Sequence, residues 1–235
     1  MPRVLIAGAS SDIGLALCRR YLDEGWEVVG HYRTRRPEFD AFVSRSFMDW
    51  KCDFSDISEL EKVIERQPEQ LQNIDSFVNL AAELKPLKFE DAKAADILRA
   101  ISVNALPGII LMQALAPAML RRGFGRFVHA SSIGVKYGGG SQSYCYSLSK
   151  HMQEFIPGSC RAWAASGVYV NVLRIGVTDT RIHAHLPERS LAERVEKIPV
   201  QRAARPEEIA EALFWYGSEK NAFTTNQVIA VAGGE

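Results

Sequence analysis

The sequence lacks several features that mark particular classes of protein. Its 28 lysines and arginines balance 28 aspartates and glutamates, so the formal net charge is zero and no basic excess predicts binding to nucleic acid. No uninterrupted apolar run reaches the roughly 18 residues of a membrane span. These absences predict neither nucleic acid nor a membrane as a partner.

Cysteine is scarce and follows no recognisable pattern. The sequence holds four cysteines, without Cys-x-x-Cys spacing and without a paired histidine, so we predict no metal site. We expect the cysteines to be reduced thiols of a cytoplasmic protein. The chain begins Met-Pro-Arg directly before an apolar segment, and we therefore expect no signal peptide.

Length and pattern predict one α/β domain that spans residues 1–235. A hydrophobic content of 47% is enough for a large core, and no repeat or linker divides the chain. Strand signals alternate with helical patterns along the whole sequence, which predicts a Rossmann-like, doubly wound parallel sheet with helices on both faces. We expect about seven strands, at residues 3–7, 26–32, 46–52, 74–79, 125–131, 167–173 and 227–231.

The first predicted strand leads into a glycine-containing turn and a helix. Residues 8–14 read Gly-Ala-Ser-Ser-Asp-Ile-Gly. A strand, a glycine turn and a helix together place a pyrophosphate at the helix N-terminus. The spacing is not the dinucleotide pattern Gly-x-Gly-x-x-Gly, so this segment alone also fits an ordinary turn between a strand and a helix.

A second group of residues indicates acid–base chemistry. Tyr146 and Lys150 are four residues apart and would share one helix face, and Ser132 precedes them. A nearby cation favours tyrosinate, so Lys150 would bring the pKa of Tyr146 closer to a useful range. Ser132 would hold a carbonyl or alcohol oxygen. As structural alternatives, Ser132 could simply end a strand and Tyr146 could be a half-buried aromatic residue.

In order, these motifs resemble those of the short-chain dehydrogenase/reductase family over nearly the whole chain. Ser132, Tyr146 and Lys150 match three members of the family's catalytic tetrad, and Asn104 matches the fourth. The resemblance implies that Tyr146 exchanges a proton with the substrate oxygen, to which Ser132 donates a hydrogen bond. It further implies that Lys150 holds the nicotinamide ribose and that Asn104 positions a water that relays protons through Lys150.

The chain departs from the family pattern at several positions. In the turn Thr-Gly-x-x-x-Gly-x-Gly, Ala7 replaces the threonine and Asp12 the middle glycine. A carboxylate repels a pyrophosphate, so we expect Asp12 to cap the helix. Ala82 replaces a glycine and Ile175 a proline, which are milder changes near the expected nicotinamide position.

The resemblance also implies the cofactor contacts. In this sequence they fall on Gly8, Ser10, Ser11, Ile13, Gly14, Arg33, Thr34, Asp53, Phe54, Asn79, Ala81, Tyr146, Lys150, Gly176, Thr178 and Thr180.

The end of the second strand indicates which nicotinamide cofactor is preferred. A carboxylate there would bind a ribose 2′-hydroxyl, whereas an arginine accommodates a 2′-phosphate. Tyr32 stands where the acid would be, and Arg33 and Thr34 follow it. We therefore predict NADP(H), with NAD(H) possible. Ser11 argues against this choice because many NADP-dependent relatives carry a basic residue there, and the basic segment could instead be a solvated loop.

Together the motifs predict an NADP(H)-dependent oxidoreductase that reduces a ketone or aldehyde, or oxidises the matching secondary alcohol. One alternative is an NAD-linked alcohol or cyclic diol dehydrogenase. An alternative of another class is a catalytically idle nucleotide-binding regulator. The identity of the small-molecule substrate, and whether it is a carrier-protein or coenzyme A thioester, stay open.

Two further expectations concern assembly and access. Residues 106–120 form a helical pattern that is apolar nearly all round, which favours burial against a second subunit as well as the sheet. We expect a homotetramer or homodimer, the tetramer by resemblance. Pro157 and Gly158 should interrupt the helix that carries Tyr146, and residues of about 178–200 should form a mobile lid over the substrate.

Overall fold

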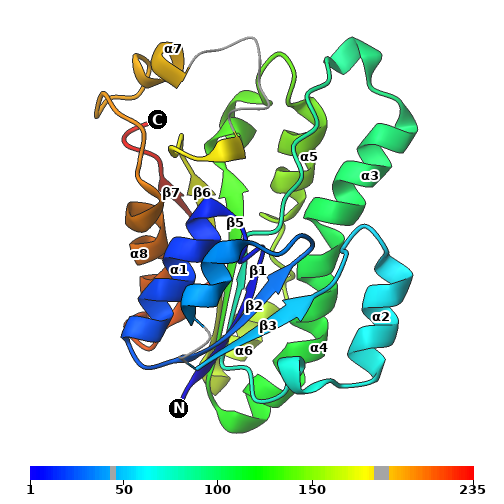
Figure 1. Cartoon of the computed structure of the whole chain (residues 1–235), viewed down its shortest axis with the longest axis vertical. Helices are drawn as coiled ribbons and strands as arrows, with labels where there is room; N and C mark the ends of the chain where they lie inside the picture. Colours follow the sequence, from blue (N-terminus) through cyan, green and yellow to red (C-terminus); the bar gives the residue numbers. More distant parts are fainter. Residues whose placement is uncertain (43–45, 183–190) are drawn as a thin grey trace.

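The computed structural model describes residues 1–42, 46–182 and 191–235. Within them the chain forms a parallel sheet of seven strands in the order β3-β2-β1-β4-β5-β6-β7, as predicted (Figure 1). The strands are β1 (Arg3–Ala7), β2 (Glu27–Tyr32), β3 (Phe47–Lys51), β4 (Ser76–Asn79), β5 (Gly125–Ser132), β6 (Val168–Ile175) and β7 (Gln227–Val231).

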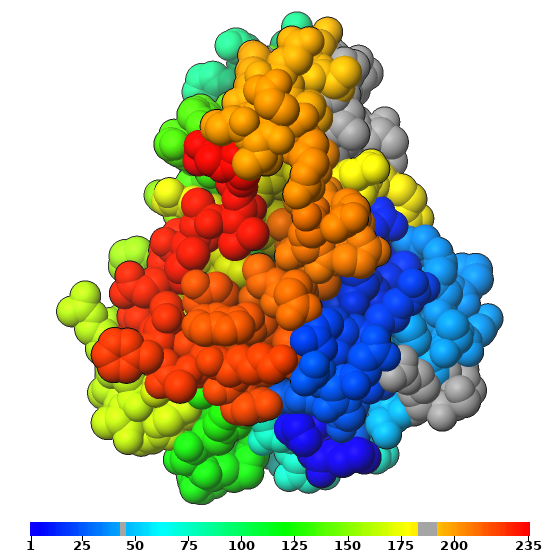
Figure 2. Space-filling view, turned by 90° about the vertical axis from the view of Figure 1, so that its left-hand side faces the viewer, coloured from blue at the N-terminus to red at the C-terminus, as the bar shows by residue number. Residues whose placement is uncertain are grey.

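Helices cover both faces of this sheet. On one face α1 (Asp12–Asp23) and α8 (Pro206–Gly217) pack side by side, and Figure 2 shows this side of the molecule. The opposite face carries α2 (Ile57–Glu65), α4 (Leu106–Arg122) and α6 (Cys160–Trp163). The chain also forms α3 (Ala94–Asn104), α5 (Tyr144–Met152) and α7 (Leu191–Val195), and short 3₁₀ turns at Pro37–Phe42, Glu69–Leu71, Phe89–Asp91, Ile133–Tyr137 and Ala164–Ser166.

Strand alternation divides the core into two layers. Along β1, Val4 and Ile6 point to the layer under α1 and α8, whereas Leu5 and Ala7 point to the layer under α2 and α4. All four side chains are fully buried. A continuous apolar run in the sequence therefore corresponds to a strand that is covered on both faces.

The strand order places a ligand cleft at the centre of the sheet. The chain moves outward from β1 to β2 and β3, and then crosses back to place β4 on the other side of β1. The carboxyl ends of β1 and β4 therefore flank a topological switch point, where such sheets bind ligands.

Two glycines close the turn after β1. Gly8 has a φ of +79°, and a Cβ there would lie 2.9 Å from the backbone nitrogen of Ala81. A Cβ on Gly14 would lie 2.5 Å from the carbonyl oxygen of Gly8. Only glycine allows the turn, the first helix and the end of β4 to approach this closely.

The apolar helix predicted at residues 106–120 is α4, and it packs against the sheet. With α3 it forms a helical stretch, Ala94–Arg122, that is long and apolar enough to span a membrane. Of the most apolar part of this stretch, 56% is buried inside the structure, and a core helix passes the same test.

The helix that carries Tyr146 is interrupted, as predicted. It ends at Met152, five residues before Pro157, and the chain becomes helical again only at Cys160. Proline disfavours the α conformation in the residue before it, so the helix cannot run through this segment. Of the lid expected at about 178–200, residues 183–190 lie outside the described residues.

Candidate functional site

A large cleft of about 1730 Å³ lies at the carboxyl edge of the sheet. It brings together turns that are far apart in the sequence, which is the arrangement that the parallel sheet predicts. Of the residues predicted from the sequence, those that line it are Ser11, Ile13, Arg33, Ser132, Tyr146, Lys150, Gly176, Thr178 and Thr180.

Ser132 and Tyr146 meet inside this cleft. Ser132 ends β5, and its Oγ accepts a hydrogen bond of 3.1 Å from the backbone N–H of Gly134. Burial raises the pKa of Tyr146 to about 12, although a side-chain hydrogen bond with Ser132 opposes the rise. The two hydroxyls can therefore contact one substrate oxygen.

Lys150 is held one turn further along α5. Its side chain is buried, and its Nζ donates hydrogen bonds to the carbonyl oxygens of Ala130 at 2.8 Å and Ala81 at 3.4 Å. Burial lowers the pKa of Lys150 to about 7.

The expected lowering of the Tyr146 pKa by Lys150 is not found in this structure. The Lys150 Nζ lies 5.9 Å from the centroid of the Tyr146 ring, and burial makes the charged forms of both groups unfavourable. Four-residue spacing brings the two side chains to one face, but it does not reveal how deeply they are buried.

Asn104 connects three elements behind the cleft. Its Oδ1 accepts a hydrogen bond of 2.7 Å from the backbone N–H of Glu83, and its Nδ2 donates to Glu83 O at 3.0 Å and to Ser149 Oγ at 2.9 Å. Its own carbonyl oxygen accepts a hydrogen bond from Gln153 Nε2. Asn104 therefore joins the end of α3 to the helix that carries Tyr146 and Lys150.

His31, which the sequence reasoning missed, connects the ends of three strands. Its Nδ1 accepts a hydrogen bond of 3.2 Å from Gly8 N–H, so its Nε2 donates to Cys52 O at 3.0 Å. The ring stacks on Phe54 with centroids 3.7 Å apart. Burial lowers the pKa of His31 to about 4, which keeps it neutral and able to accept from the glycine turn. A histidine at the end of an otherwise apolar strand was the only signal in the sequence.

Several of the predicted cofactor residues do not line this cleft. The Oδ1 of Asn79 accepts a hydrogen bond of 3.2 Å from Ala81 N–H, and Asp53 Oδ1 accepts one of 2.9 Å from Ser55 N–H. Both side chains shape turns at the ends of strands. In the described part of the chain, the predicted residues that do not line the cleft are Gly8, Ser10, Gly14, Thr34, Asp53, Phe54, Asn79, Ala81 and Asn104.

Arg33 enters the cleft but is paired with a carboxylate. Its Nη1 donates to Glu83 Oε1 at 3.2 Å. The same carboxylate accepts two hydrogen bonds from Arg99, at 2.7 and 3.0 Å. Thr34, beside Arg33, is exposed. The sequence did not indicate Glu83 or Arg99, because the pairs join residues 50 and 16 positions apart.

The expectation that Asp12 caps the first helix was wrong. Ser11 is the N-cap, and its Oγ accepts a hydrogen bond of 3.0 Å from Gly14 N–H. Asp12 occupies the first helical position, where its carboxylate forms ion pairs with Arg36 and Arg181. A cap needs the residue before the helix, and the serine in that position supplies it.

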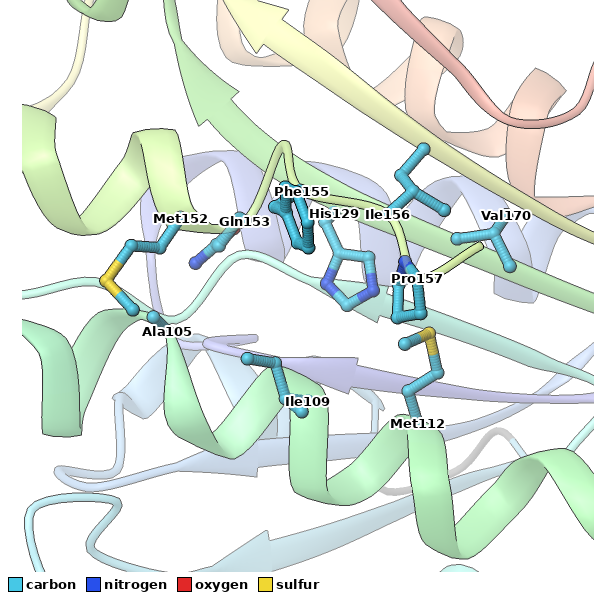
Figure 3. A pocket seen from close by; sticks show the side chains of 10 residues that line it. All are labelled: Ala105, Ile109, Met112, His129, Met152, Gln153, Phe155, Ile156, Pro157 and Val170. Atoms are coloured by element: carbon cyan, nitrogen blue, oxygen red, sulfur yellow. The ribbon is translucent and has the colours of Figure 1, made fainter. Parts of the chain in front are cut away.

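A second, smaller cavity of about 310 Å³ lies beside the interruption of α5 (Figure 3). Its walls are mainly apolar side chains of α4, such as Ile109 and Met112, and of the segment 152–157. His129 projects into its centre, and Lys150 lies close enough for its charge to help burial lower the pKa of this histidine to about 4. The charge of Lys150, which lines the main cleft, therefore acts on a histidine that lines the smaller cavity.

The residues of the main cleft fit a nicotinamide dinucleotide. Gly8 and Gly14 let the turn between β1 and α1 pack tightly against neighbouring backbone, and Ser11, Asp12 and Ile13 at the N-terminus of α1 line the cleft, where a diphosphate would meet the helix terminus. Among the described residues, no group of three or more histidines, cysteines, aspartates or glutamates could hold a metal ion.

Comparison with known proteins gives relatives along the full length. A family model described as enoyl-(acyl carrier protein) reductase matches residues 8–235. The chain is 27% identical to a 3-oxoacyl-[acyl-carrier-protein] reductase of Thermotoga maritima, over 98% of this chain and 96% of that one. It is 29% identical to an acetoacetyl-CoA reductase of Rhizobium meliloti, over 100% and 99%. A solved 3-oxoacyl (acyl-carrier-protein) reductase of Agrobacterium tumefaciens with NADP bound superposes with a TM-score of 0.86 at 26% identity, over 100% and 94%.

The buried lysine generates a prediction about stability and pH. Because the folded-state pKa of about 7 lies below the value of about 10.4 for an unfolded lysine, the wild-type protein should gain stability as pH rises through that window. Lys150→Met removes this dependence. The difference in unfolding free energy between the variant and the wild type should therefore favour the variant more at about pH 6 than at about pH 10. This change should be at most about 5 kcal/mol, since one pKa unit corresponds to about 1.4 kcal/mol.

Urea unfolding of both proteins without cofactor, at a series of pH values, measures this difference. Lys62→Met, at an exposed position of α2, is the matched control and should follow the wild type. Parallel pH profiles for wild type and Lys150→Met would show that Lys150 titrates normally.

Proposed function

Because the chain belongs to the short-chain dehydrogenase/reductase family, we propose that it uses NADP(H) to reduce a ketone or aldehyde, or to oxidise the matching secondary alcohol. Family membership makes the chain an oxidoreductase that interconverts C=O and CH–OH groups with a nicotinamide cofactor. The observation that carries the finer proposal is the meeting of the Ser132 and Tyr146 side chains in the cleft beside Lys150.

The bound cofactor supplies or accepts the hydride, and the protein's own groups manage the oxygen and its proton. In reduction, Ser132 donates a hydrogen bond to the carbonyl oxygen, and Tyr146 donates the proton as negative charge develops there. Lys150, which backbone carbonyl oxygens hold beside Tyr146, would hold the nicotinamide ribose. Asn104 holds α5 in place through its hydrogen bond to Ser149, and the position of Tyr146 depends on that helix.

The proposed preference for NADP(H) rests on Arg33 and its partners. A 2′-phosphate that binds Arg33 must compete with Glu83, which lies 3.2 Å from the guanidinium. The two shorter hydrogen bonds from Arg99 keep Glu83 paired after Arg33 leaves it. Arg33 can therefore move to a phosphate without leaving a lone carboxylate in the site.

We expect Arg33→Met to weaken NADPH binding and leave NADH binding nearly unchanged. A hydrogen bond to a charged group contributes about 1.5 to 3 kcal/mol, which corresponds to a loss of about 10- to 150-fold in affinity. Calorimetric titration of wild type and variant with both cofactors measures it. Arg35→Met is a suitable control, because Arg35 pairs with Asp40 and Asp49 instead. Equal or tighter binding of NADH by the wild type would overturn the preference.

The substrate class follows from a direct assay. Two of the relatives are named for the reduction of 3-oxoacyl thioesters, so such thioesters are the first compounds to test, beside simple ketones, aldehydes and cyclic diols. Oxidation of NADPH is followed at the nicotinamide absorbance band.

We propose that this activity takes place in the cytoplasm, with no nucleic acid or membrane partner.

On a substrate found in this way, Tyr146→Phe should lower turnover by about 100-fold or more, because general acid–base groups contribute roughly 10² to 10⁴. The cofactor affinity should not change, since the variant removes only the phenol oxygen. Tyr144→Phe, two residues earlier in the same helix, should keep most of the activity. If Tyr146→Phe retained more than about a tenth of the turnover, the acid–base assignment would be wrong.

We further propose that the chain forms a homodimer or homotetramer through α4 and the segment around Pro157. Phe155 is 86% exposed at the edge of the small cavity, and Ile109 of α4 lines the same cavity. A two-fold axis beside this surface would bury both residues against their own copies.

Light scattering after size exclusion, at about micromolar concentration, should give a multiple of the 26.2 kDa chain mass. Phe155→Ser should shift the distribution toward the monomer, because it removes an exposed aromatic ring from the contact. Circular dichroism checks that the variant is folded. A wild-type protein that is monomeric at this concentration would contradict the proposal.

A further inference from the structure

Asp12 creates an electrostatic problem in the phosphate-binding turn. It stands where the family pattern has a glycine, at the first position of α1, and it lines the main cleft. Burial raises its pKa, but hydrogen bonds and charges from Arg181 and Arg36 outweigh this effect and hold the pKa below its usual value. The carboxylate is therefore ionised at the helix terminus that receives the cofactor diphosphate, where a second anion is repelled.

Two arginines surround this carboxylate. Arg36 Nη1 donates to Asp12 Oδ1 at 2.7 Å, and Arg36 also pairs with Glu38. Arg181 is bound twice: its backbone N–H donates to Asp12 Oδ2 at 2.9 Å, and its Nε donates to Oδ1 at 3.1 Å. Asp12 thus fixes both the main chain and the guanidinium of a residue 169 positions later.

The two arginines differ in their access to the cleft. The side chain of Arg36 is 19% exposed and does not line the cleft, whereas that of Arg181 is 63% exposed and does line it. The Nη2 of Arg181 lies 3.5 Å from the carbonyl oxygen of Ser10, so the guanidinium reaches across the turn between β1 and α1. Ser11 and Ile13 of this turn line the same cleft.

We propose that Arg181 is the cation that binds the cofactor diphosphate, and that Asp12 holds it over the turn. The inference rests on the proposed use of a nicotinamide cofactor. Its ligand is the diphosphate, which NADPH and NADH share, so Arg181 contributes affinity for both cofactors. Because Arg36 is also paired with Glu38, the cluster of Asp12, Glu38, Arg36 and Arg181 is neutral, whereas without Arg181 it would present one net negative charge to the diphosphate. The replacement of glycine by aspartate is thereby compatible with nucleotide binding.

The test compares Arg181→Met with Arg33→Met by calorimetric titration with NADPH and NADH. Arg181→Met should weaken the binding of both cofactors to the same extent, by about tenfold or more in affinity, as expected for a lost charge-assisted hydrogen bond. Arg33→Met should weaken the binding of NADPH alone. Arg181→Lys keeps the charge and should lose less than Arg181→Met. Arg202→Met is the matched control, since Arg202 is similarly exposed and paired with a carboxylate, Glu208, but does not line the cleft.

A double-mutant cycle tests the part played by Asp12. In the Arg181→Met protein, Asp12→Asn should tighten cofactor binding several-fold, because it removes a carboxylate that has lost one of its two cations. In the wild-type protein the same substitution should weaken binding slightly, because loss of the anchor for Arg181 outweighs the relief of repulsion. Equal effects in the two backgrounds would show that Asp12 and Arg181 act independently.

The outcomes separate this inference from the proposed function. If the wild-type protein bound neither cofactor, the proposed function itself would fail. If the wild type bound both but a folded Arg181→Met did so equally well, the role of Arg181 would be refuted alone. A loss confined to NADPH would assign Arg181 to the 2′-phosphate and overturn its assignment to the diphosphate. Thermal unfolding of each variant establishes that it is folded.

Discussion

The close approach of the turn after β1 to the turn after β4 is the contact on which the site depends. Gly8 reaches the backbone of Ala81 so closely that no side chain fits between them. The N–H of Gly8 is held by His31, and the carbonyl oxygen of Ala81 accepts a hydrogen bond from Lys150. One backbone contact therefore connects the turn proposed to bind the nucleotide to the part of the cleft that contains Tyr146 and Lys150, the proposed acid–base residues.

Two carboxylates that line the cleft are each paired with two arginines. Glu83 joins two arginines at the expected adenosine end, and Asp12 joins two more beside the phosphate turn. A cofactor phosphate can then exchange one partner of such a group while the carboxylate keeps the other. Such an exchange costs less free energy than leaving a carboxylate unpaired in the site, because each carboxylate keeps one arginine throughout. Lys150 is different: it lies against backbone carbonyls, and its burial is offset by hydrogen bonds instead of a counter-charge.

Local patterns in the sequence predicted what local physics determines. The seven strands, the turn at Gly8 and the positions of Ser132, Tyr146 and Lys150 at one edge of the sheet all follow from hydrophobic runs and parallel topology. Contacts between distant segments could not be inferred, because no spacing rule relates Asp12 to Arg181. The prediction that Lys150 lowers the pKa of Tyr146 was wrong for a related reason. Sequence spacing indicates which side chains are near each other, whereas the balance between burial and charge depends on all the groups that pack around the phenol.

A polar side chain at the C-terminal end of α5 connects this helix to α3. Gln153, the C-cap residue of α5, donates a hydrogen bond to the carbonyl oxygen of Asn104 at the end of α3. Asn104 in turn holds Ser149, one residue before Lys150. The helix that carries Tyr146 and Lys150 is thus fixed at its end by a hydrogen-bonded link to α3, although it is only nine residues long. Because a short helix has little apolar surface to pack against the sheet, the orientation of α5 depends on these polar contacts more than the orientation of a longer helix would.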